Sequence, residues 1–360
     1  MIVNQWVGAA HRYDAIGDHA RHVQVILRAM GHTSEIYGLT VDEDLRDIVR
    51  PFDHPDARSG DVTIFHYALP SAMTGAFADL PRGRVLHYHN ITPAHYFAPY
   101  NAGQYRLCRV GREHLRRLVG HADLALGVSE FNRLELQEMG FAETGVMPIA
   151  VDVDRLTKAP RRPALERILD DGLTNILFVG RIAPNKRIDD YIRFAEHYKR
   201  YVNIDYRFIF VGRTDAVPHY YSAIRTLLLQ YEMPHDRFMF TGPVTDEDLA
   251  AYYRMASVYL SLSEHEGFCV PLLEAMAMDV PILAYAAGAV PDTLSGSGVL
   301  FSPRDFEYAA ELLGELVFND DLRGEVIGGQ RRRLADFGDG RVEKDLRAAL
   351  SRVAGNTSVR

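Results

Sequence analysis

Cysteine is scarce in this chain: its 360 residues include only Cys108 and Cys269. Two cysteines cannot build a disulfide framework or a four-cysteine zinc ribbon, so the composition favours a reducing compartment. Long apolar runs are also lacking, because the longest near-miss, residues 275–290, is interrupted by an aspartate, a proline and a glycine. The first residues lack the cationic start and apolar stretch of a signal peptide. We therefore expect a cytoplasmic protein.

An excess of positive charge is absent as well. The formal net charge is −8, so no overall basic field attracts the protein to nucleic acid, and we expect no nucleic-acid partner. The hydrophobic share of 47% and the charged share of 24% are those of globular proteins, which excludes a disordered or collagen-like chain. At about 100–200 residues per domain, the length predicts about two domains.

Three widespread motifs are missing. No G-x-G-x-x-G follows the first expected strand, which disfavours a nicotinamide dehydrogenase. No G-x-x-x-x-G-K-[ST] occurs, so P-loop phosphoryl transfer is excluded. The segment G-V-S-E-F at 127–131 lacks the second glycine of a nucleophile elbow.

Short apolar runs alternate with amphipathic stretches along the chain. The strands that we expect form two series, one within residues 2–149 and one within 175–284, with helical patterns between them. Strands that alternate with helices predict parallel sheets covered on both faces. The fold class is therefore α/β, with two doubly wound, Rossmann-like domains facing a cleft. Such sheets bind ligands beyond the carboxyl ends of their strands.

The boundaries of the domains follow from the same pattern. We expect an N-terminal domain over residues 1–155 and a C-terminal domain over residues 173–335. Residues 156–172 are charged, contain two prolines and lack a strand pattern, so we interpret them as a linker. The last stretch, 336–360, is expected to be a helix that packs back toward the N-terminal domain.

The most informative segment is S-E-H-E-G-F-C-V-P-L-L-E-A-M at residues 263–276. A strand leads into it and an apolar helix follows, with Pro271 in the first helical turn. Glu266 precedes the helix and Glu274 lies inside it, so two carboxylates flank the free amides of a helix start, where anions bind. A capped helix with one solvated glutamate is the alternative. The amides expected at this helix start belong to Phe268, Cys269 and Val270.

A second segment, F-V-G-R-I-A-P-N-K-R at 178–187, places cations in a loop after a strand. Gly180 ends the strand, and Arg181 and Lys186 follow, five residues apart. Arginine grips a phosphate with two hydrogen bonds and lysine acts as a point charge, so the loop suits a phosphate. A solvated surface loop is the alternative. In the N-terminal loop, residues 11–18, Gly17 would let backbone approach a ligand closely.

Histidines gather at expected strand ends. His66 follows one strand, and His87 and His89 end the next, where alternate residues share a face. Such a pair can bind zinc, but no carboxylate or cysteine within a few residues completes a site, so we expect no metal. A hydrogen-bonding role in the cleft is the favoured interpretation.

Taken together, these segments resemble the retaining glycosyltransferases of family 4, the group 1 glycosyltransferases, which have the GT-B fold. Residues 263–276 are similar to the family's S-x-x-E-G-F-G-x-P-x-x-E-A-M. The match runs from the first strand to at least Leu300. Further segments match in the family's order: His89-Asn90 after a strand, Pro148–Asp152 (P-N-G-V-D in the family), Gly180-Arg181 with Lys186, and Gly288–Asp292 (G-G-V-P-E).

The chain departs from the family at three positions. Cys269 and Arg187 stand where glycines are usual, and the first loop has only Gly17 in place of a glycine pair. No departure removes a charged ligand group, so the resemblance implies an active enzyme whose donor is left open.

The resemblance implies retaining transfer of a hexose from a UDP- or GDP-linked sugar to a hydroxyl of a glycan or lipid-linked acceptor, of the cell-surface polysaccharide type. It also implies that the N-terminal domain, residues 1–155, binds the acceptor and that the C-terminal domain, residues 173–335, binds the nucleotide sugar. The leaving phosphate accepts the proton, so neither a metal nor another cofactor is implied. Roles are implied for the following residues: Arg181 and Lys186 at the leaving phosphate, with the backbone of Gly17, Gly180 and the helix start; Glu266 at the donor sugar; Glu274 at the ribose; His89 at the transferred sugar; and His66, Asn90 and Tyr96 on the acceptor side.

Two questions stay open at this point. Arginines make the helix at 104–119 basic, so it is either a solvated face or a peripheral contact with the inner face of an anionic membrane. The same fold also serves phosphorylases, which use inorganic phosphate on a disaccharide, and a degenerate copy could be a non-enzymatic scaffold. A scaffold is expected to lose Arg181, Lys186 or a glutamate of the pair, and all of them are present.

Overall fold

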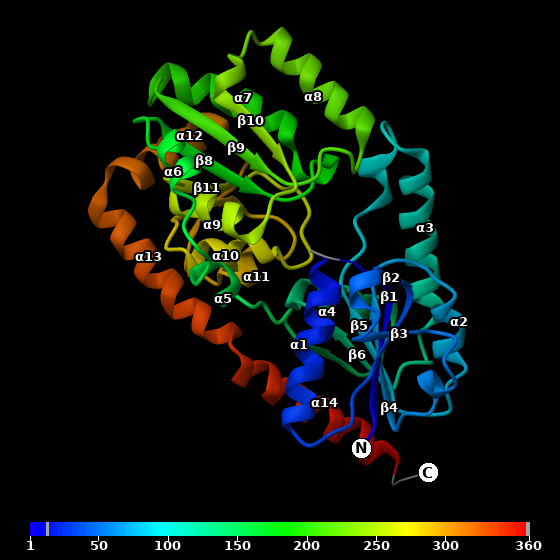
Figure 1. Cartoon of the computed structure of the whole chain (residues 1–360). Helices are drawn as coiled ribbons and strands as arrows, with labels where there is room; N and C mark the ends of the chain where they lie inside the picture. The colour runs from blue at the N-terminus through cyan, green and yellow to red at the C-terminus, as the bar shows by residue number, and fades with distance from the viewer. Residues whose placement is uncertain (12–13, 358–360) are drawn as a thin grey trace. The chain divides into compact units, whose positions relative to one another are not determined.

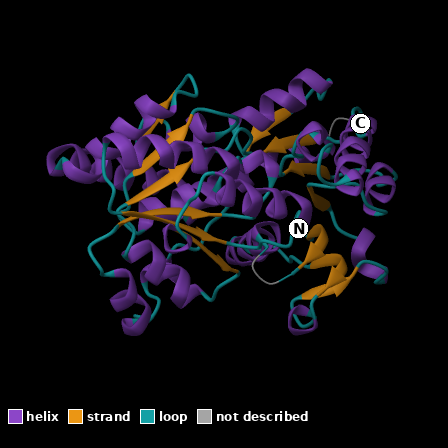
Figure 2. Cartoon of the chain, turned by 90° about the horizontal axis from the view of Figure 1, so that it is seen from above, coloured by secondary structure: helices purple, strands orange, loops and turns teal. Residues whose placement is uncertain are grey.

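The computed structural model describes residues 1–11 and 14–357, which form two compact units. Unit 1 comprises Met1–His95, Gly103–Val151 and Asp336–Arg360, and unit 2 comprises Tyr96–Ala102 and Asp152–Ala335. Each unit contains a sheet of parallel strands flanked by helices (Figure 1 and Figure 2).

Unit 1 is built on a seven-stranded sheet with the order β3-β2-β1-β4-β5-β6-β7. Its strands are β1 (Val3–Ala10), β2 (Ile36–Val41), β3 (Val49–Pro51), β4 (Val62–Tyr67), β5 (Arg84–Tyr88), β6 (Leu124–Gly127) and β7 (Thr144–Val146). Its helices are α1 (Ala15–Ala29), α2 (Met73–Ala78), α3 (Ala102–Arg117), α4 (Glu130–Met139) and α14 (Asp339–Thr357). Short 3-10 turns lie at Glu43–Leu45 and Pro55–Arg58, and a third, Ala94–Phe97, begins in unit 1 and ends in the Tyr96–Ala102 segment of unit 2.

Helix α1 shows how the sequence builds this unit. The Asp14 carboxylate caps the helix by accepting from the Gly17 amide at 3.2 Å. Val23 and Leu27 recur at helical spacing and are fully buried. They share one apolar cluster with Val62 of the sheet and Leu346 of α14, so α1 and α14 cover the same part of the sheet (Figure 1).

Unit 2 is built on a six-stranded sheet with the order β10-β9-β8-β11-β12-β13. Its strands are β8 (Thr174–Val179), β9 (Tyr206–Val211), β10 (Phe238–Gly242), β11 (Val258–Ser261), β12 (Ile282–Tyr285) and β13 (Val299–Phe301). Its helices are α5 (Asp154–Thr157), α6 (Pro163–Leu169), α7 (Ile188–Tyr201), α8 (Pro218–Gln230), α9 (Asp246–Arg254), α10 (Val270–Ala277), α11 (Val290–Leu294), α12 (Phe306–Phe318) and α13 (Asp320–Leu334). Short 3-10 turns lie at Pro184–Lys186 and His235–Arg237, and a third, Ala335–Phe337, begins at the last residue of unit 2 and continues into unit 1.

The central strands of unit 2 are buried and mainly apolar because both faces of the sheet are covered. In β9 all six residues are buried, and in β11 all four are. Every strand pair in both sheets is parallel. In each unit the order reverses beside the first strand, as it does in a doubly wound Rossmann sheet. The predicted fold class is confirmed.

Residues 156–172, interpreted from the sequence as a linker, differ from that expectation. Most of this stretch is the end of α5 and the helix α6, and Leu156 and Leu169 are buried in the core of unit 2. Because these helices are short and carry charged residues on their solvent side, the sequence does not show their apolar contacts.

In the part of the chain that the structure describes, no helix is both long and apolar enough to cross a membrane.

Candidate functional site

The topology of unit 2 brings two of the predicted motifs together. Its strand order reverses at β8, which lies between β9 and β11, and open α/β sheets bind ligands outside the carboxyl ends of strands at such a point. The loop after β8 carries Gly180, Arg181 and Lys186, and the loop after β11 carries Glu266. Residues 80 positions apart thus meet at one edge of the sheet.

Lys186 and Glu266 form an ion pair across these two loops. The Lys186 Nζ lies 2.5 Å and 2.6 Å from the two carboxylate oxygens of Glu266. Only 17% of the lysine side chain and 8% of the glutamate side chain are exposed, so water screens the pair little. The sequence predicted both as ligand groups but not their contact. The pair holds one positive and one negative group side by side.

Arg181 is placed differently from Lys186. It is exposed, and none of the ion pairs among residues 1–11 and 14–357 includes it. Gly180, just before it, has a φ of 152°, in the region that favours glycine. The guanidinium is therefore a cation without a carboxylate partner, at the end of the strand where a phosphate is expected.

Helix α10 starts with an unusual residue. Cys269, the residue before it, has φ 71° and ψ 68°, a left-handed conformation that costs a non-glycine residue about 1–2 kcal/mol. Pro271 occupies the first turn, as predicted from the sequence. Phe268 and Cys269 are buried, and the Phe268 carbonyl accepts from the Thr293 hydroxyl at 2.7 Å. Val270 begins the helix itself.

The segment Gly288–Asp292 fixes the backbone of Glu266. The Ala289 amide donates to the Glu266 carbonyl at 3.0 Å. A Cβ atom on Gly288 would lie 2.5 Å from that same carbonyl oxygen, and the φ of Gly288 is 56°. A glycine is required here because the two backbones approach so closely.

Glu274 is held by partners that the sequence did not indicate. It is 3% exposed, and Arg155 donates to its Oε1 while the Tyr253 hydroxyl donates to its Oε2 at 2.9 Å. Burial raises the pKa of Glu274, and Arg155 opposes that rise. Arg155 also pairs with Asp246. The predicted ribose ligand is thus a buried carboxylate with an arginine against it.

A second charged network borders the same loops. Arg187 has a left-handed φ of 53° and donates to Glu264 at 3.0 Å and to Asp190 at 3.1 Å. Arg304 pairs with Asp190 from another part of unit 2, and Asp190 is 2% exposed. Arg187, which stands where the family has glycine, therefore anchors the loop. Arg304 has no local sequence signal, since its partners lie far away along the chain.

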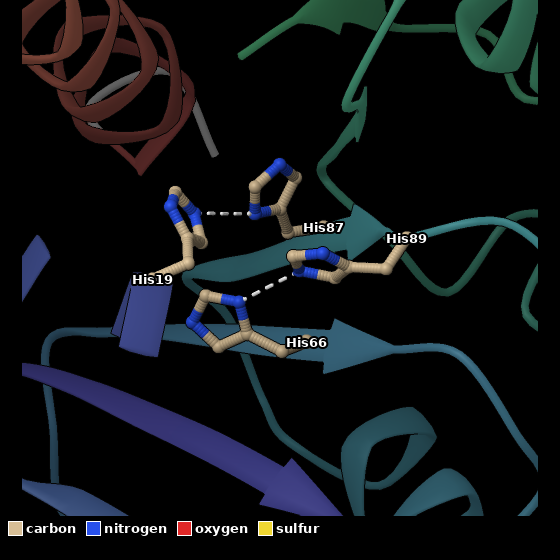
Figure 3. A group of neighbouring side chains, drawn as sticks. All are labelled: His19, His66, His87 and His89. Carbon is tan, nitrogen blue, oxygen red and sulfur yellow. Dashed lines mark hydrogen bonds between the residues drawn. The ribbon is translucent and has the colours of Figure 1, made fainter. Parts of the chain in front are cut away.

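In unit 1 the predicted histidines lie at the corresponding reversal of the strand order, beside β1 and β4. His66, near the end of β4, and His87 of β5 are buried, and His89 directly follows β5. They meet His19 of α1, which the sequence analysis did not single out, and ligand-capable atoms of the four lie within 4.8 Å of one another (Figure 3). His19 was missed because a histidine on a helix gives no signal of what it faces.

The other predicted residues lie in both units. The Gly17 amide donates to Asp14, and a Cβ there would meet nothing closer than 3.6 Å. Arg12 and Tyr13, in the predicted loop 11–18, lie outside the described residues. Asn90 has a left-handed φ of 74° and donates to the Asn132 side chain at 2.7 Å. Tyr96, expected in the N-terminal domain, belongs to unit 2, where its ring faces that of His265.

Comparison with known sequences finds similarity to glycosyltransferases. The model of the family "Glycosyl transferases group 1" matches residues 166–333. A GDP-mannose-dependent alpha-mannosyltransferase of Mycobacterium tuberculosis is 28% identical over 260 residues, which are 70% of this chain and 63% of that protein. A D-inositol 3-phosphate glycosyltransferase of Corynebacterium jeikeium is 30% identical over 219 residues, 58% of this chain and 52% of that one. The chain thus spans between about half and two thirds of these two relatives.

A longer match and two solved structures agree with this. A GDP-mannose-dependent alpha-(1-6)-phosphatidylinositol monomannoside mannosyltransferase of M. tuberculosis is 25% identical over 347 residues, 91% of this chain and 82% of that protein. Anabaena HepE, solved in complex with UDP and glucose, has a TM-score of 0.76 at 15% identity, covering 98% of this chain and 99% of its own. WaaG, a glycosyltransferase involved in lipopolysaccharide biosynthesis, has a TM-score of 0.71 at 14% identity, covering 96% and 98%. At these identities the structural likeness concerns the fold.

The matched region, residues 166–333, contains both predicted cations and both glutamates. Both sheets have the Rossmann order, and the solved structures share the fold over nearly the whole chain. The resemblance drawn from the sequence agrees with these findings: residues 166–333 match the group 1 glycosyltransferases, and the chain has the GT-B fold.

Proposed function

We propose that the chain is a retaining glycosyltransferase that moves a hexose from a nucleotide diphosphate sugar to a hydroxyl of a glycan or lipid-linked acceptor. The observation that carries the proposal is the Lys186–Glu266 pair at the strand reversal of unit 2, with Arg181 exposed in the loop that also carries Lys186. A diphosphate needs cations, and a sugar needs hydrogen-bond acceptors. At this edge of the sheet the Lys186 cation and the Glu266 acceptor are hydrogen-bonded to each other.

The leaving diphosphate is assigned to Arg181 and Lys186. The exposed Arg181 guanidinium can grip a phosphate with two hydrogen bonds, without first breaking an ion pair. The Lys186 ammonium has three donors, so it can keep Glu266 and still donate to a phosphate oxygen. Each such preorganised donor is worth about 10²–10³ in rate, because charge grows on the phosphate during transfer.

The two glutamates are assigned to hydroxyls of the donor. A carboxylate has about four lone-pair sites. Glu266 uses two of them for Lys186, and Glu274 uses two for Arg155 and Tyr253, so each can still accept from a hydroxyl. We assign Glu266 to the sugar and Glu274 to the ribose. Attack and departure on the same face of the sugar let the leaving phosphate take the proton, and this scheme uses no metal or other cofactor.

The names of the relatives guide the choice of donor and acceptor. GDP-mannose occurs in the names of two of the relatives given above, and HepE was solved with UDP and glucose, so UDP- and GDP-linked hexoses are the candidate donors.

The transferred sugar and the acceptor are assigned to residues of the other motifs. His89 is assigned to the transferred sugar, and His66, Asn90 and Tyr96 are assigned to the acceptor side. Helix α3 exposes Arg106, Arg109, Arg116 and Arg117, a charge that suits an anionic inner membrane surface carrying a lipid-linked acceptor.

The test is a transfer assay with purified protein. GDP-mannose, GDP-glucose, UDP-glucose and UDP-galactose are each incubated with glycan and lipid-linked acceptors, and the anomeric configuration of the product is read by NMR. We expect transfer from one nucleotide class with the configuration of the donor kept. Inversion would contradict the retaining mechanism. Breakdown of a disaccharide that depends on inorganic phosphate, without nucleotide binding, would identify a phosphorylase instead.

A further inference from the structure

Four imidazole rings lie together in unit 1 and are hydrogen-bonded in pairs. His19 Nε2 lies 3.3 Å from His87 Nδ1, and His66 Nδ1 lies 3.0 Å from His89 Nε2, so the group consists of two pairs (Figure 3). The ring centroids of His87 and His89, one from each pair, are 4.4 Å apart. Because a neutral imidazole has one N–H and one lone pair, the outer contacts of each pair determine where its protons are.

The protons of the first pair are fixed by backbone at both ends. The Ala150 N–H donates to His19 Nδ1 at 2.9 Å, so that nitrogen carries a lone pair and the proton of His19 is on Nε2. At the other end His87 Nε2 lies 2.9 Å from the Met147 carbonyl, which can only accept. His87 therefore has its proton on Nε2 and accepts from His19 through Nδ1.

The protons of the second pair are fixed from one end only. The Gln5 Nε2 donates to the Ala20 carbonyl at 3.0 Å, which orients the amide so that its Oε1 faces His66 Nε2, also at 3.0 Å. His66 must donate to that oxygen, so its Nδ1 accepts from His89 Nε2–H. The remaining nitrogen, His89 Nδ1, then carries a lone pair. It is buried and has no hydrogen-bond partner.

A neutral state for all four rings is consistent with their surroundings. Burial lowers the pKa of His19, His66 and His89 well below the usual value, and lowers that of His87 to about 4. Neighbouring histidines lower the pKa of His19, His66 and His89 further. None of the four therefore carries a second ring proton near neutral pH.

We propose that Gln5 and His66 are positioning residues that hold His89 in a single neutral tautomer, with the Nδ1 lone pair presented to a bound ligand. The ligand group at this position must then donate a hydrogen bond. A hydroxyl or an amide N–H fits, whereas a carboxylate or phosphate oxygen does not. In taking that group as a hydroxyl of the sugar, the proposal rests on the proposed function. The placement of the protons does not.

The positions of the ring protons also distinguish these four histidines from a four-histidine metal centre. A metal needs lone pairs on the nitrogens that face the middle of the group, and His19 has its proton there because Ala150 donates to the other nitrogen. His66 and His87 each donate their Nε2–H to an acceptor outside the group, the Gln5 Oε1 and the Met147 carbonyl, as metal-binding histidines do. A metal on His66, His87 and His89 would move the proton of His89 to Nδ1, the opposite of the proposed state.

The test reads the ring protons directly, on ligand-free protein with 15N-labelled histidine. Long-range proton–nitrogen NMR correlations separate a ring nitrogen that carries a proton from one that carries a lone pair. We expect Nε2–H on all four rings and a lone pair on His89 Nδ1. A proton on His89 Nδ1, or stoichiometric zinc in the purified protein, would overturn the proposal.

Two variants and a matched control test the positioning role. Gln5→Leu removes the acceptor of His66 Nε2–H, and His66→Phe removes the acceptor of His89 Nε2–H while keeping a ring, so in each we expect His89 to populate both tautomers. Gln24→Leu removes another buried amide, which donates to the Ser34 carbonyl, and should leave the tautomers unchanged. A single unchanged tautomer of His89 in both Gln5→Leu and His66→Phe would refute the role.

The ligand is tested with donor sugars that lack one hydroxyl at a time. For the wild type we expect one deoxy donor to bind about threefold to tenfold more weakly than the full donor, the value of one neutral hydrogen bond. In Gln5→Leu that difference should shrink, while Gln24→Leu should keep it. If every deoxy donor is equally affected by Gln5→Leu, the ligand assignment is wrong. If no nucleotide sugar binds at all, the proposed function fails, and the NMR result still decides the tautomer.

Discussion

Replacing Arg155 by methionine should strongly destabilise unit 2. The substitution keeps most of the aliphatic stem but removes the cation that pairs with Glu274, a side chain that is 4% exposed. Removing one partner of a buried ion pair typically costs 3–5 kcal/mol. Because Tyr253 still donates to Glu274 and Arg155 itself is 29% exposed, we expect about 3 kcal/mol at pH 7.

The loss should depend on pH in a defined direction. Burial already raises the pKa of Glu274 above the value of 4.5 for a free side chain, and removing Arg155 removes a group that lowers it. A carboxyl group whose pKa is higher in the folded state binds protons more readily there, so stability falls as pH rises above about 4.5. The deficit of Arg155→Met relative to the wild type should therefore shrink between pH 7 and pH 5.

Urea denaturation at both pH values measures this, with three comparisons. Glu274→Gln in the Arg155→Met background removes the stranded charge and should recover part of the loss. Arg213→Met, which breaks a pair with Asp215 in which both side chains are more than 60% exposed, should cost less than about 1 kcal/mol. A deficit below 1 kcal/mol in Arg155→Met, or one that is the same at pH 5 and pH 7, would refute the reasoning.

Three further predictions concern activity. Arg181→Ala should lower transfer by about 10²-fold or more with little change in the melting temperature, because the side chain is exposed, and near-normal turnover would remove its phosphate role. Glu266→Gln should mainly lower kcat, whereas Glu274→Gln should mainly raise the donor KM and weaken nucleotide binding about tenfold to a hundredfold, and calorimetry with the nucleotide alone separates the two. Activity should persist in EDTA, and a loss restored by Mg²⁺ or Mn²⁺ would contradict transfer without a metal.

The fold could be predicted well from the sequence because its central strands are apolar runs bounded by turns and separated by amphipathic helices. Strands β2 and β3 do not show this pattern in the sequence, because β2 contains Gly38 and β3 has only three residues. Helices α5 and α6 cannot be recognised from the sequence for a different reason. Each is shorter than the window over which helical periodicity can be recognised, and packing against the core of unit 2 stabilises it.

The candidate site could be predicted only in part, for reasons of distance along the chain. Lys186 and Glu266 each stand in a local motif, and the rule that sites form at strand reversals brings them together. Arg155 contacts Glu274 from 119 positions away and stands in a stretch that looks like a charged linker. His19 is 131 positions from its partner Ala150. No local pattern encodes such contacts, because they depend on how the elements pack.

Calorimetric titration with nucleoside diphosphates tests the central claim most directly. The claim is that the strand reversal of unit 2 binds the diphosphate of a sugar donor through Arg181 and Lys186. We expect either GDP or UDP to bind the wild-type protein, and Arg181→Ala and Lys186→Met each to weaken that binding about tenfold or more. Failure of every nucleoside diphosphate to bind, or equal affinity in the wild type and both variants, would contradict the account.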